Sequence, residues 1–545
     1  MLAPEMNGRT SNPAAGFFRW GLVAAVAAFA WLRFSDNIAD NDLWGHVLYG
    51  ERNLAAGAIE RTDPFSWTAT GQPWINHEVL AEIALGGAHR VGGATGLWLL
   101  MIALSAATVL WALRQGAAGD TDQRWAAVLL LGASVNFIAL GCAARPQLFT
   151  LLALVALFSA LRGFFGGRLA AGSMLPPLFA LWANAHGGFL AGLLVLVVAA
   201  VSEIALLVVP RLAGAIPFAP PSWRPGWMRI AATTVISILA VALNPWGLGL
   251  LRWTIASVAL ARPHITEWQP MALNAGNAAF FIVLVLSAAG WIVSRRPRRL
   301  WEAAALALLA AMAVASRRHA PLFGLANLIL TPRHLADAFD RIRGRIASLR
   351  RLAVQPAFQW VTGIALAAAA ISSVRASMAA PREHPWSIEV PRDEYPVAAI
   401  AFIRAQHLNG NMLTFFDWGQ QVIWELPDNP VSFDGRLDTV YSPEIMEAHW
   451  ALSAGQRITP ALHLERARVA LLPTESGGID LLRAAGWKLL YRDPLASVLV
   501  PGRAASPGHA ADIPPVFLGA PAVSGRVLFP NAPPALADPR RRANR

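Results

Sequence analysis

Long apolar segments recur through the first 374 residues of this 545-residue chain, with short polar loops between them. A helix that crosses a bilayer needs about 20 mostly apolar residues and must satisfy its own backbone hydrogen bonds. Only 14% of the residues are charged, compared with about 25% in soluble proteins. The pattern predicts an α-helical polytopic membrane domain over residues 1–374 with about eleven spans, at 17–34, 97–113, 125–143, 147–161, 174–188, 189–209, 229–244, 278–293, 300–315, 319–331 and 357–374.

The distribution of arginine predicts the orientation of these spans, because short cytoplasmic loops collect basic residues. With the N-terminus inside, the inner loops hold 19 of the 28 arginines in residues 1–374, and the outer loops hold nine arginines and nine acids. The positive excess therefore follows membrane topology and argues against a nucleic-acid partner. We expect a multi-pass protein of the bacterial inner membrane, with a cytoplasmic N-terminus and a periplasmic C-terminal domain.

The composition changes near Pro381 to that of a water-soluble domain. Short apolar runs alternate there with segments of helical spacing, which predicts a small α/β domain over residues 381–502. The runs are at 411–416, 430–433, 468–472, 487–491 and 496–500. Residues 503–545 are rich in alanine, proline and arginine, a composition typical of a disordered tail. A single cysteine, Cys142, excludes an intramolecular disulfide framework and a cysteine metal cluster.

The first predicted outer loop, residues 35–96, begins with three carboxylates and a histidine at the membrane surface, Asp36, Asp40, Asp42 and His46. Carboxylates in such a place serve as a general base toward an acceptor or as ligands of a divalent cation. A solvated acidic loop that only enforces topology explains the same pattern.

Further along this loop, Trp67 and Trp74 predict a segment that lies along the membrane interface. His77 and Glu78 follow, and they either face a substrate or open an amphipathic helix over residues 77–89.

An acidic motif after the first span, many spans and a C-terminal outer domain together resemble the GT-C superfamily of integral-membrane glycosyltransferases. The stretch Asp42-Leu43-Trp44-Gly45-His46 resembles the first-loop Asp-x-Trp/Tyr pattern of oligosaccharyltransferase-like members. Protein mannosyltransferases and lipid A aminoarabinose transferases are similar in plan. The motifs Asp-Pro-Phe-Ser-Trp-Thr, Trp-Ala-Asn-Ala-His-Gly-Gly, Asn-Pro-Trp-Gly and Asp-Trp-Gly also resemble uncharacterised bacterial proteins placed near that superfamily.

The resemblance implies transfer of a sugar from a polyprenyl-phosphate-linked donor to an extracytoplasmic acceptor. Asp42 matches the first-loop aspartate best, as a base or acceptor-orienting group, and Asp40 is the second choice. If a metal takes part, the resemblance implies Mg²⁺ or Mn²⁺ at these two carboxylates. The tail has no counterpart of the Trp-Trp-Asp motif by which oligosaccharyltransferases recognise their acceptor, which argues against N-glycosylation.

A lipid-phosphate donor needs cations at the outer interface, where arginine offers parallel N–H groups to phosphate oxygens. Three outward arginines, Arg145, Arg317 and Arg318, are predicted to bind it together with the adjacent His319. Arginine near a helix end also reaches lipid headgroups without any other function. The 317–319 cluster places positive charge on the outer side, contrary to the positive-inside rule. This exception favours a function for the cluster.

Eight further residues are predicted to bind substrate, and for each a structural role is the alternative. His186 stands in a turn beside two glycines, Asp434-Gly435 is typical of a tight turn, and Glu267 belongs to a long outer loop. The eight residues are His46, His77, Glu78, His186, Glu267, Asp417, Asp434 and Arg436.

Two other functions remain open. A non-catalytic assembly protein of an envelope polysaccharide system would share this plan. A lipid-linked substrate transporter or flippase would carry ionisable residues in mid-span and inverted repeats. Glu203 is the main mid-span ionisable residue and no internal repeat is evident, which ranks the transporter last.

Overall fold

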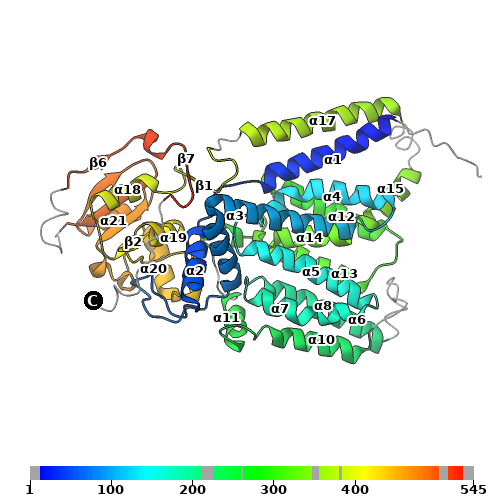
Figure 1. The fold of residues 1–545 in the computed structure, drawn as a ribbon, viewed down its shortest axis with the longest axis horizontal. Coiled ribbons are helices and arrows are strands. Elements are labelled where there is room, and N and C mark those ends of the chain that lie inside the picture. The colour runs from blue at the N-terminus through cyan, green and yellow to red at the C-terminus, as the bar shows by residue number, and fades with distance from the viewer. Residues whose placement is uncertain are drawn as a thin grey trace, which may run out of the picture.

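The computed structural model describes residues 13–209, 225–258, 260, 262–345, 355–379, 383–502 and 513–531. The described part is elongated, with a helical bundle at one end and an α/β unit at the other (Figure 1). Every predicted apolar segment overlaps a bundle helix. These helices are α1 (Pro13–Phe34), α3 (Val79–Gly116), α4 (Thr121–Ala139), α5 (Gln147–Phe165), α6 (Leu169–Ser173), α7 (Leu175–Ala183), α8 (Phe189–Val208), α10 (Trp227–Ala240), α12 (Ala278–Val293), α13 (Leu300–Ala315), α14 (Ala320–Leu330), α15 (Pro332–Arg345) and α17 (Pro356–Ala379).

Five segments in the described residues are long and apolar enough to cross a membrane, namely α1, α3, α5, α8 and Ala275–Val293, which contains α12. The helix α5 is apolar on all sides, and it accordingly lies inside the bundle against α3, α7 and α14. At Gly93 the backbone adopts φ +56°, a left-handed conformation that favours glycine, and α3 bends there. The bend separates the first turns of α3, next to the α/β unit, from its apolar second half.

The α/β unit is built on a five-stranded sheet in the order β2–β3–β5–β4–β6. The pairs β2–β3 and β4–β6 are parallel, and β3–β5 and β5–β4 are antiparallel. Four of the five predicted apolar runs form strands, while the run 430–433 forms only isolated bridges at Val431. The elements are β2 (Met412–Thr414), β3 (Val469–Pro473), β4 (Trp487–Arg492), β5 (Ala496–Pro501), β6 (Val516–Phe517), α18 (Val397–Ala405), α19 (Gly419–Glu425), α20 (Pro443–Ser453) and α21 (Gly478–Ala484).

Part of the segment expected to be a disordered tail is folded. β6 pairs with β4, and β7 (Arg526–Leu528) pairs antiparallel with β1 (Glu389–Pro391). Phe529 is buried against Trp44 and Trp424. Composition misses this segment because one anchoring aromatic and two short pairings hold it, rather than an apolar run. Residues 503–512 and 532–545 lie outside the described residues, as do Arg9, Arg211, Arg224, Arg350 and Arg351 of the predicted inner loops.

The first loop is built into the α/β unit. Ala39 N–H donates to the Glu389 carbonyl at 2.8 Å, and Trp67 N–H donates to the Val431 carbonyl at 3.0 Å. Trp67 and Trp74 are therefore buried in the protein, which differs from the interfacial placement expected for them. The helix α2 (Leu43–Ala56) packs between α3 and α19. Its first residues are thus held at the junction of the two parts.

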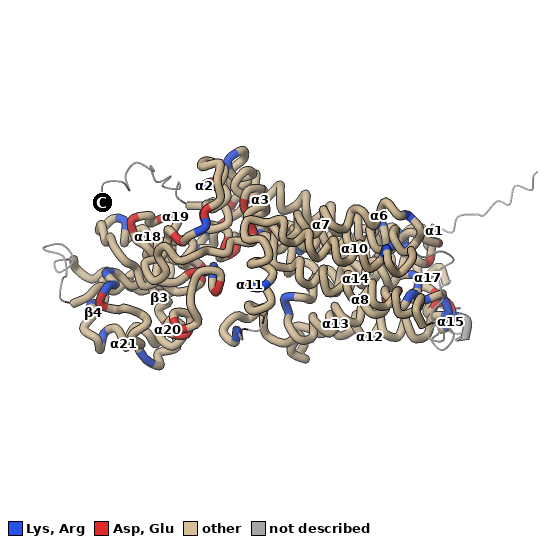
Figure 2. The backbone as a smooth tube through the Cα atoms, turned by 90° about the horizontal axis from the view of Figure 1, so that it is seen from below, with Lys and Arg blue, Asp and Glu red and all other residues tan. Residues whose placement is uncertain are grey.

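Charge separates along the long axis of the molecule. Arginines of the predicted inner loops gather at the end of the bundle farthest from the α/β unit, near α1, α6 and α15 (Figure 2). Most acidic residues lie in the α/β unit and the loops next to it, where basic residues are interspersed with them (Figure 2). The polar residues expected on the outer side therefore lie together at one end of the bundle.

Candidate active site

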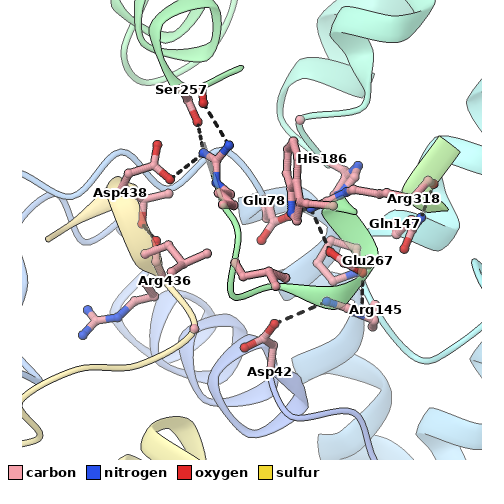
Figure 3. Close-up of a pocket in the computed structure, with 18 of the residues that line it drawn as sticks. Asp42, Glu78, Arg145, Gln147, His186, Ser257, Glu267, Arg318, Arg436 and Asp438 are labelled. Carbon is pink, nitrogen blue, oxygen red and sulfur yellow. Dashed lines mark hydrogen bonds and ion pairs between the residues drawn. The ribbon is translucent and has the colours of Figure 1, made fainter. Parts of the chain in front are cut away.

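A cavity of about 800 Å³ lies where the bundle meets the α/β unit. Its walls come from the start of α2 and α3, the loops before α5 and α8, and the loop after α11 (Leu248–Val258) (Figure 3). Most of the predicted site residues line it: Asp40, Asp42, His46, His77, Glu78, Arg145, His186, Glu267, Arg318, His319, Asp417 and Arg436. Residues that are far apart in sequence thus share one chamber.

Asp42 stands directly before α2, and one arginine links it to Asp40. Arg145 Nε lies 3.1 Å from Asp40 Oδ1, and Arg145 Nη2 donates to Asp42 Oδ2 at 3.4 Å. Burial and the nearby Asp40 carboxylate raise the pKa of Asp42 to about 7, although Arg145 opposes the shift. Near neutral pH the Asp42 carboxylate is therefore basic enough to accept a proton.

Arg145 also affects whether the expected metal ion can bind at Asp40 and Asp42. A guanidinium bridges the two carboxylates and supplies the positive charge that a shared cation would supply. These two residues therefore do not fit a Mg²⁺ or Mn²⁺ site in the present arrangement.

The α/β unit approaches Asp42 closely. A side chain at Gly435 would collide with Asp42 Oδ1, and a side chain at Gly45 would collide with Gln420. At both positions, polar side-chain atoms of a neighbouring element occupy the space that a Cβ would take. The Asp42 carboxylate is consequently fixed from the bundle side by Arg145 and from the tail side by Gly435.

Glu267 bridges two of the arginines that line the cavity, Arg145 and Arg318. Glu267 Oε1 accepts a hydrogen bond from Arg318 Nη1 at 3.0 Å, and its Oε2 lies 3.5 Å from Arg145 Nη1 (Figure 3). Burial favours the neutral acid, but Arg318 and Arg145 outweigh it and lower the pKa of Glu267. One anionic group thus engages both guanidiniums, as a phosphate oxyanion would.

The loop that carries Glu267 is tied to the tail. Arg262 Nη2 donates to Asp438 Oδ1 at 2.9 Å. The Trp268 ring lies 4.4 Å from the guanidinium carbon of Arg262 and 4.9 Å from that of Arg318. This loop therefore connects the Glu267 carboxylate, which lies where a phosphate would bind, to the α/β unit.

His186 and Glu78 form the wall next to Arg318. His186 Nε2 lies 3.2 Å from Arg318 Nη2 and 3.7 Å from Glu78 Oε1, while Gly188 N–H donates to His186 Nδ1 at 3.0 Å. Burial, together with Arg318, holds the pKa of His186 well below its usual value. Burial raises the pKa of Glu78, but His77, His46 and His186 outweigh it and lower the value to about 2.

Two predicted residues do not line this cavity. Arg317 lies in the 3₁₀ turn η3 (Arg317–His319), but only Arg318 and His319 are cavity residues. Asp434 is fully buried and accepts hydrogen bonds from Arg436 Nε and Nη2 at 2.9 and 2.7 Å, and from Tyr441. Burial opposes ionisation of Asp434, but Arg436 prevails and lowers its pKa. The Asp434 carboxylate therefore lies in the protein interior, where Arg436 and Tyr441 satisfy it.

Arg436 reaches the cavity with little of its surface, because its side chain is 3% exposed. Its Nη1 donates to Asp63 Oδ1 at 2.6 Å, and the rings of Phe65 and Trp74 lie 5.2 and 5.1 Å from its guanidinium carbon. The arginine thus joins the first loop to the α/β unit. Asp63 gave no functional signal in the sequence beyond its place in the Asp-Pro motif.

Sequence reasoning missed several cavity residues, Glu82, Arg262, Trp268, Gln420, Asp438 and Trp450. The sequence could have indicated Arg262, because it is one of the nine arginines assigned to the outer loops. The others lie in segments whose local pattern is that of ordinary helices and turns.

Comparison with known proteins rests on structure alone. No protein-family model matches the chain, and no curated protein matches it in sequence. The oligosaccharyltransferase of Archaeoglobus fulgidus in the apo form is similar over 90% of this chain and 75% of its own, with a TM-score of 0.54 and 12% identity. AglB from Archaeoglobus fulgidus, in complex with an inhibitory peptide and a dolichol-phosphate, is similar over 84% of this chain and 69% of its own, with a TM-score of 0.51 and 12% identity.

ArnT from Cupriavidus metallidurans in the apo state aligns over 91% of this chain and 100% of its own, with a TM-score of 0.47 and 13% identity. At 12% identity, the likeness to the two archaeal structures shows the fold alone. The helical bundle, the first-loop insertion and the C-terminal α/β unit of this chain together have the fold of the archaeal oligosaccharyltransferase.

Proposed function

We propose that the chain is a membrane glycosyltransferase that moves a sugar from a polyprenyl-phosphate-linked donor to an extracytoplasmic acceptor. The main supporting observation is a single cavity in which the basic Asp42 carboxylate lies near two arginines that share one anion. Sugar transfer from a phosphate needs such a base and such an anion site. The dolichol-phosphate in the archaeal complex supports a lipid phosphate as the donor class.

In the proposed reaction the acceptor attacks the anomeric carbon of the donor sugar. Asp42 accepts the acceptor proton, the new bond forms to the sugar, and the bond from the sugar to the phosphate oxygen breaks. Arg145 and Arg318 bind the departing phosphate, which takes the place of the Glu267 carboxylate. Asp417 and Trp450 line the tail side of the cavity, where the acceptor enters in this arrangement.

The proposal includes the topology, with eleven spans, an inner N-terminus and the α/β unit outside in the periplasm. The gathering of arginines at the end of the bundle farthest from the α/β unit supports it (Figure 2). Reporter fusions are expected to place Pro297 inside and Ala380 outside. A cytoplasmic signal from the Ala380 fusion would contradict the outward-facing site.

The activity is tested with purified protein, a panel of radiolabelled polyprenyl-phosphate sugars and an extract of envelope acceptors. Label is expected to pass to an acceptor with the wild-type protein and not with Asp42→Asn. Absence of transfer across the whole donor panel would favour the alternative of a non-catalytic assembly protein.

A further inference from the structure

A second group of ionisable side chains lines the cavity, and the proposed transfer leaves it without a role. His46 lies one helical turn after Asp42 on α2, while Glu78 and Glu82 lie one turn apart at the start of α3. His46 is 7% exposed and Glu82 is 2% exposed. The packing of α2 on α3 brings one ligand atom of each residue to within 4.8 Å of the others.

Nδ1 of the His46 imidazole faces one oxygen of each of the two carboxylates. His46 Nδ1 lies 3.6 Å from Glu82 Oε1 and 3.8 Å from Glu78 Oε2. Among the described residues no partner lies within 3.5 Å of this buried nitrogen, and the two carboxylates are the charged groups that face it. Ligands around tetrahedral zinc are about 3.3 Å apart, because each lies about 2.0 Å from the metal. The two distances from His46 are therefore close to the spacing of a ligand set, and the two carboxylate oxygens lie within 4.8 Å of each other.

The remaining carboxylate oxygens have other partners. Glu82 Oε2 accepts a hydrogen bond from Asn76 Nδ2 at 2.6 Å. Glu78 Oε1 lies 3.7 Å from His186 Nε2 and 3.8 Å from His77 Nε2. Each carboxylate thus presents one oxygen to His46 while neighbouring groups orient the other, which is how outer partners hold metal ligands.

We propose that His46, Glu78 and Glu82 bind one divalent cation, with Zn²⁺ the best match to one imidazole and two carboxylates. The three ligands leave a coordination position open toward the cavity, because the site lies in its wall. This site differs from Asp40 and Asp42, where Arg145 already provides the positive charge. A cation here adds charge one helical turn from Asp42, where it attracts an anionic or hydroxyl group of a substrate.

Zinc binding is measured on the purified, chelator-treated full chain after dialysis against ZnCl₂, with metal content read by mass spectrometry. We expect one zinc per chain and a higher unfolding temperature with zinc present, since the folded state alone has the site. His46→Gln and Glu82→Gln are each expected to weaken zinc binding by about tenfold or more. No donor or acceptor is present, so this result is separate from that of the transfer assay.

His89→Gln is the matched control. His89 Nδ1 lies 2.7 Å from Glu51 Oε1, and among the described residues this partly buried histidine–glutamate pair belongs to no group of three possible metal ligands. This variant should bind zinc as the wild type does. Absence of stoichiometric zinc in the wild-type protein, or unchanged affinity in both His46→Gln and Glu82→Gln, would overturn the proposal. If these variants fail to fold, the wild-type protein loaded with Co²⁺ decides: intense visible bands support the three-ligand site, and a weak octahedral spectrum refutes it.

Discussion

Two arginine–carboxylate clusters lie close together in this molecule, and they differ in how far their charged groups are exposed to the cavity. In the buried cluster, Arg436 is 3% exposed and its partners Asp63 and Asp434 are 0% exposed, with contacts of 2.6 to 2.9 Å. In the cavity cluster, Arg145 and Arg318 are 24% and 25% exposed, and they share Glu267 at 3.0 to 3.5 Å. The first cluster is enclosed by the protein and the second is open to the cavity.

The difference indicates what each cluster does. A buried guanidinium with all its partners in place cannot exchange them without leaving unpaired charges in the interior, so it fixes the structure. The partly exposed guanidiniums of Arg145 and Arg318 exchange the shared Glu267 carboxylate at lower cost, because water reaches them, while Arg145 keeps Asp40 and Asp42 as partners. The cavity arginines are thus suited to bind a ligand, and Arg436 is suited to join the first loop to the α/β unit.

The largest expected effect concerns the base beside the open cluster. Asp42→Asn keeps the shape of the side chain but removes its ability to accept a proton, and general base catalysis contributes about 10²–10⁴-fold. Sugar transfer should fall by that factor while the protein still folds, as measured by initial rates at saturating donor. Asp36→Asn is the control, because Asp36 is exposed and does not line the cavity. Wild-type transfer in Asp42→Asn would place the chemistry elsewhere.

The buried cluster is tested through stability. Arg436→Met leaves Asp63 and Asp434 buried without their partner, which costs about 3–5 kcal/mol of unfolding free energy. Denaturant unfolding in detergent measures the loss. Arg457→Met is the matched control, because Arg457 pairs with Glu447 on the surface and such pairs contribute about 1 kcal/mol or less. Unchanged stability with weakened acceptor binding would instead make Arg436 a substrate residue.

The open cluster is tested through donor affinity. Arg318→Ala removes one charge-assisted hydrogen bond to the donor phosphate, which contributes about 1.5–3 kcal/mol. Donor binding should weaken by about tenfold to a hundredfold, measured by titration with a polyprenyl-phosphate. Arg317→Ala is the adjacent control, and it should bind normally because Arg317 does not line the cavity. Equal losses in both variants would point to attraction of lipid headgroups.

The pH dependence of transfer follows from the raised pKa of Asp42, about 7. A general base works as the carboxylate, so transfer should fall about tenfold per pH unit below pH 7 and level off above it. The rate at subsaturating donor gives the profile. A flat profile between pH 5 and 8 would contradict the assignment of Asp42 as the base.

The same shift predicts an effect on stability with the opposite sign. The pKa of Asp42 rises on folding from 3.8 to about 7, so folding binds a proton and stability falls as pH rises between these values. The cost is complete above pH 7 and absent below about pH 4. Asp42→Asn should therefore raise the unfolding free energy at pH 8 and change it little at pH 4.

The smallest expected effect concerns the shared carboxylate. Glu267→Gln removes the anion that competes for Arg145 and Arg318, so donor binding should tighten. A partly exposed ion pair contributes about 1 kcal/mol or less, which limits the gain to about fivefold in a binding titration. Glu60→Gln is the control, since Glu60 pairs with Arg52 away from the cavity. Weaker binding in Glu267→Gln would show that Glu267 organises the arginines rather than occupying the phosphate position.

The sequence by itself determined the helices, most of the strands and much of the cavity lining. Apolar runs are local, so the burial of α5 and the positions of β3, β4 and β5 follow from the order of residues along the chain. Asp42, Arg145, His186 and Arg318 stood out because charged residues beside apolar spans need a reason.

Only the tertiary structure decided how these residues combine. Arg145 and Asp42 are separated by 103 positions, and Arg436 and Asp63 by 373. No local pattern distinguishes an arginine that shares a carboxylate in a cavity, as Arg318 does, from one enclosed by two carboxylates and aromatic rings, as Arg436 is. That distinction depends on burial and on partners that chain folding brings together, and so does the approach of His46 to Glu78 and Glu82.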